Sequence, residues 1–184
     1  MKIVFISGSR NPNGQTTHAI GAMRDGIESN GGATESVYLP TLNIERCRQC
    51  EDTGWGICRD GGTCVIEDDF AILVQQVRNA DAVVFAPPVY FGDLSESMRA
   101  MTDRLRRTCT HSAGRAGIEA KPAIGICVAG GGGGGSLSCC VTMDKVLSTC
   151  GFNVMDMIPV RRQNLKAHLN RLRLAGAWMM TTLK

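Results

Sequence analysis

Short apolar segments alternate with segments of helical spacing from the start of the chain. Lys2–Ser7 is an apolar, β-branched run that ends at Gly8, a pattern typical of a buried strand. Beyond a polar loop, Ile20, Met23 and Ile27 recur at the spacing of one helix face. The alternation continues, so we expect further strands at residues 36–39, 82–86, 123–129 and 152–160, and further helices near residues 70–77, 94–105, 140–150 and 165–179.

This βαβαβαβαβα pattern predicts an α/β fold, in which a parallel sheet carries helices on both faces. No linker, internal repeat or charge block divides the chain, so residues 1–184 are expected to form one domain. Ligands of such sheets bind outside the carboxyl ends of the strands. The loops at that edge are residues 7–17, 87–92 and 130–136, and we expect a ligand site among them.

Composition narrows the function classes. A hydrophobic content of 43% and a net charge of +3 exclude a mainly disordered chain. The apolar stretches fall far short of the roughly 18 residues that a membrane span needs, and no secretory signal is present, so a cytoplasmic protein is expected. Nucleic-acid binding is not expected without a concentrated basic stripe. The clusters Arg104/Arg106/Arg107 and Arg161/Arg162 are interpreted as solvated faces, with attraction of an anionic ligand as the alternative.

The first loop joins a strand to a helix N-terminus and suits a phosphate group. Backbone N–H groups and the helix dipole converge there, and the hydroxyls of Ser9, Thr16 and Thr17 add donors. Gln15 stands where a phosphoryl-transfer loop needs Lys, so the loop is expected to hold a monophosphate without reacting with it, as for flavin mononucleotide (FMN). An ordinary capped turn is the alternative.

The other two loops are also unusual. Residues 88–92 could flank a flat ring, or they could simply cap the core. Six consecutive glycines at 130–135 are entropically costly, and close approach of the backbone to a ligand is a good reason for them. A flexible linker is the alternative, although it fits poorly between a buried strand and a helix of one domain.

Nine cysteines are many for a chain without a signal peptide. Cys127, Cys140 and Cys150 occupy apolar strand or helix positions and are expected in the core. Four others are bunched in an irregular, glycine-rich segment, residues 41–66. They are Cys47, Cys50, Cys58 and Cys64. Four thiolates suit a [4Fe–4S] cluster or a tetrahedral zinc ion, and free thiols or a disulfide are the other interpretation.

Taken together, the three loops resemble those of the NADPH-dependent FMN reductase family, which has a flavodoxin-like fold. The resemblance rests on Ser-Gly-Ser and Asn-Gly-Gln-Thr within residues 7–16, Pro-Val-Tyr-Phe-Gly at 88–92 running on to Asp103-Arg104, and the glycine loop. The cysteine segment, followed by Val-Ile-Glu-Asp-Asp-Phe at 65–70, is similar to the iron–sulfur flavoprotein branch. In that branch a third Cys stands where this chain has Thr53.

The resemblance implies a three-layer α/β/α fold with a five-stranded parallel sheet in the order 2-1-3-4-5 that binds FMN. The FMN-binding residues that it implies are Ser7, Ser9, Arg10, Gln15, Thr16 and Thr17 in the first loop, Pro88, Val89, Tyr90, Phe91 and Gly92 in the second, and Gly130, Gly131 and Gly132 in the third. It also implies a homodimer or homotetramer with the flavin near a subunit interface.

The function that follows is an NAD(P)H-dependent FMN oxidoreductase, which passes hydride to flavin N5 and electrons to a small-molecule or protein acceptor. The cofactor carries the redox chemistry, so no catalytic side chain is predicted. One alternative is an iron–sulfur flavoprotein that carries electrons through a cluster in the 47–64 loop and is reduced by ferredoxin. Another is a zinc-stabilised interaction module on a degenerate flavin fold.

Overall fold

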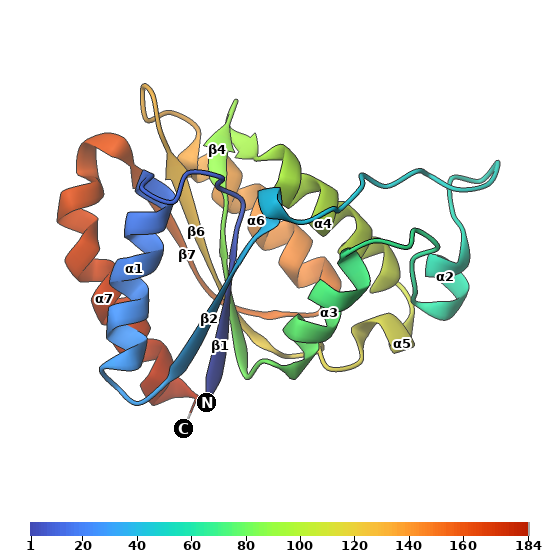
Figure 1. Ribbon diagram of the computed structural model, residues 1–184, viewed down its shortest axis with the longest axis horizontal. Coiled ribbons are helices and arrows are strands. Elements are labelled where there is room, and N and C mark those ends of the chain that lie inside the picture. The colour runs from blue at the N-terminus through green and yellow to red at the C-terminus, as the bar shows by residue number, and fades with distance from the viewer. Residues whose placement is uncertain (184) are drawn as a thin grey trace.

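A central sheet forms the middle layer of the molecule (Figure 1). The computed structural model describes residues 1–183. Five parallel strands build the sheet in the order β2-β1-β3-β6-β7. Their bounds are β1 Lys2–Ser7, β2 Ala33–Tyr38, β3 Ala82–Ala86, β6 Pro122–Ala129 and β7 Asn153–Arg161. This is the predicted flavodoxin-like order, so the fold prediction is confirmed.

A hairpin adds two short strands, so the sheet has seven strands and the predicted count of five is wrong. They are β4, Pro88–Tyr90, and β5, Asp93–Leu94. β4 runs parallel to the end of β6, with Pro88 opposite Val128 and Val89 opposite Ala129. The expectation of a loop at residues 87–92 failed because a proline can occupy the first position of a strand.

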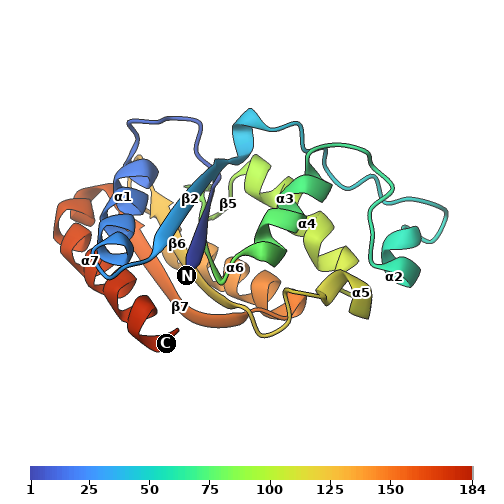
Figure 2. The ribbon, with the colours of Figure 1, turned by 60° about the horizontal axis from the view of Figure 1, so that its bottom comes forward.

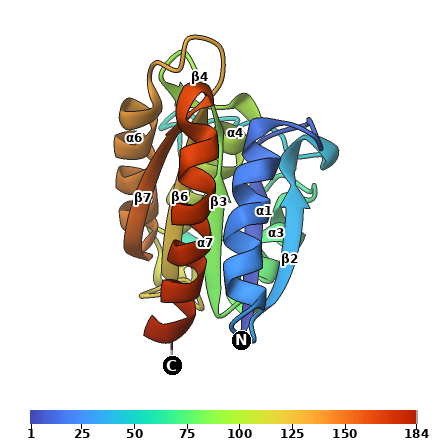
Figure 3. The ribbon, with the colours of Figure 1, turned by 90° about the vertical axis from the view of Figure 1, so that its left-hand side faces the viewer.

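Helices cover both faces of the sheet (Figures 2 and 3). The two helices on one face are α1, Gln15–Glu28, and α7, Leu165–Thr182; the three on the other are α3, Phe70–Asn79, α4, Glu96–Thr108, and α6, Ser136–Cys150. Alternate side chains of β1 explain the two layers. Ile3 and Phe5 pack with the α1–α7 pair, whereas Val4 and Ile6 pack with the other three helices.

Short helices occupy the connections. They are α2, Ile57–Gly61, α5, Ser112–Arg115, and the 3-10 turns Leu39–Thr41 and Arg162–Asn164. The helix α2 lies inside the cysteine-rich segment, where the sequence predicted no helix. This segment packs on the α3–α4 side, at the opposite end of the molecule from α1 and α7 (Figures 1 and 2).

Five cysteines belong to the core, including the three that the sequence assigned to it. Cys109, Cys127, Cys139, Cys140 and Cys150 are all buried. Hydrogen bonds with Cys139 and Cys140, together with burial, raise the pKa of the Cys127 thiol far above its ordinary value. The Cys127 thiol therefore remains protonated. All five buried cysteines pack in the core, where a cysteine behaves as a small hydrophobic group. Among helices formed by residues 1–183, none has both the length and the apolar character needed to span a membrane.

Candidate functional site

A cleft of about 630 Å³ opens at the carboxyl ends of the parallel strands. In Figure 1 this is the upper edge of the sheet, where the loops after β1 and β6 and the β4–β5 hairpin meet. The residues that line it come from those three segments. They are Ser9, Asn11, Asn13, Gly14, Gln15, Thr16, His18, Pro88, Val89, Tyr90, Val128, Ala129 and residues 130–134.

The first loop is shaped by its own short side chains. The Ser7 hydroxyl accepts a hydrogen bond from the backbone N–H of Ser9 (3.2 Å), and Ser9 in turn accepts one from Asn11 (3.3 Å). The hydroxyl of Thr17 donates to the carbonyl oxygen of Asn11 (2.9 Å). These bonds fold the loop back over the first turn of α1, where Thr16 is buried against the cleft.

The first turn of α1 is open toward this cleft. Gly14, the residue before the helix, provides no side-chain cap, and the first turn carries no acidic residue. The leading N–H groups of a helix have no acceptor inside it, and they carry the positive end of the helix dipole. Gln15 Oε1 is buried and without a hydrogen-bond partner among the described residues. The turn therefore offers N–H donors to an anion. Beside them lies the Gln15 amide oxygen, an acceptor without a partner.

The hairpin and the glycine loop form the opposite wall. The two backbones nearly touch, because a Cβ placed on Gly135 would clash with the Cα of Gly92. Both glycines have left-handed backbones, with φ of +81° and +79°. Gly130, Gly132 and Gly134 differ, since none has a positive φ and a Cβ there would meet nothing within 4 Å. The chain itself therefore gives no reason for glycine at these three positions.

Most of the predicted FMN residues line the cleft. Those that do are Ser9, Gln15, Thr16, Pro88, Val89, Tyr90, Gly130, Gly131 and Gly132. Those outside its lining are Ser7, Arg10, Thr17, Phe91 and Gly92. Ser7 is fully buried beneath the loop, whereas Arg10 and Phe91 project into solvent. Sequence reasoning missed Asn11, Asn13 and His18, although two asparagines beside Gly14 were a visible signal of a donor-rich turn.

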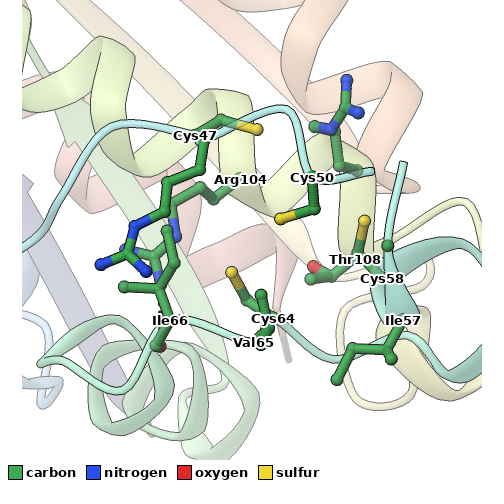
Figure 4. A pocket seen from close by; sticks show the side chains of 12 residues that line it. Cys47, Cys50, Ile57, Cys58, Cys64, Val65, Ile66, Arg104 and Thr108 are labelled. Atoms are coloured by element: carbon green, nitrogen blue, oxygen red, sulfur yellow. Dashed lines mark hydrogen bonds between the residues drawn. The ribbon is translucent and has the colours of Figure 1, made fainter. Parts of the chain in front are cut away.

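The four clustered cysteines line a second, smaller cavity, the cysteine pocket. Cys47, Cys50, Cys58 and Cys64 share it with the side chains of α4 (Figure 4). Twelve described residues line the pocket, including three arginines, Arg48, Arg104 and Arg107, and no Asp or Glu. Thiolates are anionic ligands, so four thiols ringed by arginines fit the chemistry of a negatively charged metal–thiolate centre.

The thiols are not arranged as a finished ligand set. Within residues 1–183 no group of three or more His, Cys, Asp or Glu side chains is placed to hold a metal ion. The free volume of the pocket is about 20 Å³, close to that of one water molecule. A metal centre would therefore require the pocket to widen and its thiols to turn toward one another.

A buried ion pair forms the floor of the cysteine pocket. The Arg104 guanidinium donates two hydrogen bonds to the Asp68 carboxylate, at 2.6 and 2.9 Å, with both side chains at most 1% exposed. Arg104 also donates to the carbonyl oxygens of Glu45 (3.1 Å) and Ile66 (3.3 Å). The expectation that this arginine belongs to a solvated face is wrong. Glu45 and Ile66 lie in the cysteine-rich segment and Asp68 lies just after it, so these partners could not be found from the helix alone.

The same contacts shift both pKa values. Burial alone would raise the pKa of Asp68, but Arg104 and the N–H groups of Glu45 and Phe70 outweigh it and lower the pKa. Burial alone would lower the pKa of Arg104, but hydrogen bonds with Asp68 and Cys64 raise it above the ordinary value. Both groups are therefore held in their charged forms.

The family model of the NADPH-dependent FMN reductases matches residues 1–167. The chain belongs to this family. The match includes all three loops around the cleft and the whole cysteine-rich segment, so the resemblance inferred from the motifs is confirmed.

This FMN reductase family member is also similar to curated proteins named iron–sulfur flavoproteins. The protein of that name from Methanosarcina thermophila is 34% identical over 104 residues, which cover 56% of this chain and 52% of the relative. One from Methanocaldococcus jannaschii is 32% identical over 106 residues, covering 58% of this chain and 52% of the relative. The chain thus spans about half the length of the curated relatives it matches.

Solved structures of two proteins described as reductases share the fold. An NAD(P)H:quinone oxidoreductase from Methanothermobacter marburgensis superposes with a TM-score of 0.70 at 20% identity, covering 97% of this chain and 98% of that one. A structure described as a flavone reductase gives a TM-score of 0.72 at 20% identity, covering 100% of this chain and 63% of the other. At such identity, the likeness shows the flavodoxin-like fold alone.

Proposed function

We propose that this protein is an FMN-dependent oxidoreductase whose flavin occupies the cleft at the carboxyl edge of the sheet. The observation that carries the proposal is the open first turn of α1, which faces the same cleft as the β4 hairpin and the glycine loop. Family membership over residues 1–167 supports it independently.

The chain's own groups suit the two ends of FMN. The uncapped N–H groups after Gly14, with the hydroxyls of Ser9 and Thr16, would bind the phosphate. The buried Gln15 Oε1 would accept a hydrogen bond from a ligand donor. On the opposite wall, Pro88, Val89 and Tyr90 would contact the flat ring system, and the empty space in front of Gly130 and Gly132 would admit its edge.

When bound, FMN supplies two-electron chemistry, and we propose NAD(P)H as the hydride donor. The protein positions the flavin and shields part of it from water. Backbone N–H groups of residues 130–134 would stabilise negative charge on the reduced ring, because preorganised donors act strongly in a partly desolvated site. Hydride transfer to flavin needs no acid or base side chain from the protein. The electron acceptor would approach from the open side of the cleft.

Replacing Thr16 tests the phosphate end of the site. Thr16→Ala should weaken FMN binding about tenfold or more, because a hydrogen bond to a charged group contributes about 1.5–3 kcal/mol. Thr16→Ser should restore affinity. Thr149→Ala is the matched control, since that exposed hydroxyl donates only to the Lys145 carbonyl on α6. Fluorescence titration of the stripped protein with FMN measures each affinity. Unchanged affinity in Thr16→Ala would remove it from the site, and absence of binding by the unaltered protein would refute the proposal.

A second candidate function is an iron–sulfur flavoprotein that accepts electrons from ferredoxin. Two observations favour it, namely the four thiols that line one arginine-rich pocket and the names of the curated relatives. Cys58→Ser should abolish iron uptake during anaerobic reconstitution, whereas Cys150→Ser, which alters a core thiol, should not. Full iron content in Cys58→Ser would exclude Cys58 as a ligand. Comparing reduction by NADPH with reduction by ferredoxin separates the two candidates.

A further inference from the structure

Arg107 is the cation of the cysteine pocket that has no carboxylate partner. Arg48 pairs with Glu45 (2.8 Å) and Arg104 with Asp68 (2.6 Å). Arg107 makes no ion pair among residues 1–183, and its Nε is buried with no hydrogen-bond partner there. The pocket thus holds one uncompensated positive charge and one unused donor beside four thiols.

Trp55 fixes the position of this side chain. The Arg107 guanidinium lies 4.1 Å from the centre of the Trp55 ring, and it also donates to the carbonyl oxygen of Gly54. Arg59 lies 5.6 Å from the same ring. A guanidinium over the face of an indole ring is attracted by the negative charge of that face. The chain between Cys50 and Cys58 is thereby held against α4.

These contacts explain how the pocket stays closed although two of its thiols are widely spaced. Compared with the compact cysteine pattern of the iron–sulfur flavoproteins that the sequence resembles, residues 52–57 are an insertion, and they lengthen the gap between Cys50 and Cys58. A longer loop costs more entropy to close. Trp55, at the centre of the insertion, stacks on Arg107 of α4 and so returns both flanking cysteines to the pocket.

We propose that Arg107, positioned by Trp55, is the counter-charge of an anionic metal–thiolate centre in the cysteine pocket. The proposal rests on the second candidate function. A tetrathiolate centre carries net negative charge, and one-electron reduction makes that charge larger. A fixed guanidinium within the pocket favours the reduced form more than the oxidised one, because its attraction grows with the negative charge. Arg107 therefore raises the reduction potential of the centre.

The test uses full-length protein reconstituted anaerobically with ferrous iron and sulfide. Iron per chain and the midpoint potential, from a dithionite titration followed by electron paramagnetic resonance, are measured for the unaltered protein, Arg107→Gln and Arg107→Lys. We expect Arg107→Gln to keep its iron and to show a more negative midpoint. Arg107→Lys should lie nearer the unaltered protein, because the charge remains. Arg106→Gln is the matched control, since Arg106 neighbours Arg107 on α4 but pairs with Asp103 outside the pocket.

Two variants of Trp55 provide a second, independent test of the proposal. Trp55→Phe retains an aromatic face and should leave the midpoint close to that of the unaltered protein. Trp55→Leu should shift it in the same direction as Arg107→Gln. Iron content and midpoint unchanged in both Arg107→Gln and Trp55→Leu would overturn the proposal. Equal loss of iron in Arg107→Gln and Arg107→Lys would also overturn it, because it would indicate a structural role.

The failure of the underlying function looks different. If the unaltered protein takes up no iron, the second candidate function is refuted, and so is the proposed role of Arg107. If it binds iron at normal stoichiometry while the potential is insensitive to Arg107, only the present inference is refuted.

Discussion

At the scale of single residues, Asp68 and Arg104 link the cysteine-rich segment to the body of the fold. Removing one member of a buried ion pair leaves the other charge unpaired, at a cost of about 3–5 kcal/mol. Asp68→Asn should therefore lower the free energy of unfolding by about that amount, measured by urea denaturation. Asp103→Asn, which breaks the exposed pair with Arg106, should cost less than about 1 kcal/mol. Equal effects of the two substitutions would contradict this account.

The lowered pKa of Asp68 sets the pH dependence of this stabilisation. A carboxyl whose pKa falls on folding stabilises the folded state fully above its unfolded value, about 3.9, and loses that contribution as the pH falls through the folded value. The difference in unfolding free energy between the unaltered protein and Asp68→Asn should thus be largest near neutral pH and shrink below about pH 4. A difference that stays constant down to pH 2 would contradict the assignment.

Two glycines of the same loop should respond differently to alanine. Gly135→Ala forces a left-handed backbone and a clash with Gly92, so it should lose about 1–3 kcal/mol of unfolding free energy. Gly132→Ala meets neither problem, so its stability should change by less than about 0.5 kcal/mol, while its added methyl group should weaken FMN binding. Thermal denaturation and FMN titration of both variants check this, and equal destabilisation would refute the distinction.

At the scale of elements, periodicity located the strands and helices because each buries one regular face. It missed β4, because the pair Pro87-Pro88 hid a short strand, and α2, which is a single short helix of five residues. It also placed Arg104 on a solvated face, because the pattern of α4 alone cannot reveal a partner that lies 36 residues away in sequence. Local sequence predicts the face of a helix, whereas ion pairs between distant segments depend on tertiary packing.

The element α4 joins the two candidate sites. Ser95 and Ser97, at its start, donate hydrogen bonds to the carbonyl oxygen of Gly8 beneath the cleft, at 3.4 and 3.2 Å. Arg104, Arg107 and Thr108, near its end, line the cysteine pocket. From Glu96 to Arg107 the helix rises about 16 Å, at 1.5 Å per residue. A change of the cysteine segment that shifts α4 would therefore be felt at the base of the cleft.

At the scale of the whole molecule, the alternating pattern predicted a parallel sheet covered by helices, and the family resemblance implied the strand order that the structure has. The cleft was predictable as well, since the carboxyl ends of parallel strands meet at one edge. The residues of each loop that face the cleft were harder to predict. Ser7 and Thr17 have the right chemistry, but their hydroxyls serve the loop itself. Side-chain direction within a loop depends on such local hydrogen bonds, which residue types alone do not determine.

The central claim is that the cleft holds FMN that NAD(P)H can reduce. An absorption spectrum of anaerobically purified, full-length protein, recorded before and after addition of NADPH, tests it most directly. We predict a two-banded flavin spectrum, at about one flavin per chain, that bleaches with NADPH. A protein that shows no flavin bands and takes up none on incubation with FMN would contradict the claim. Flavin that NADPH leaves oxidised but reduced ferredoxin bleaches would contradict the proposed donor and favour the iron–sulfur flavoprotein.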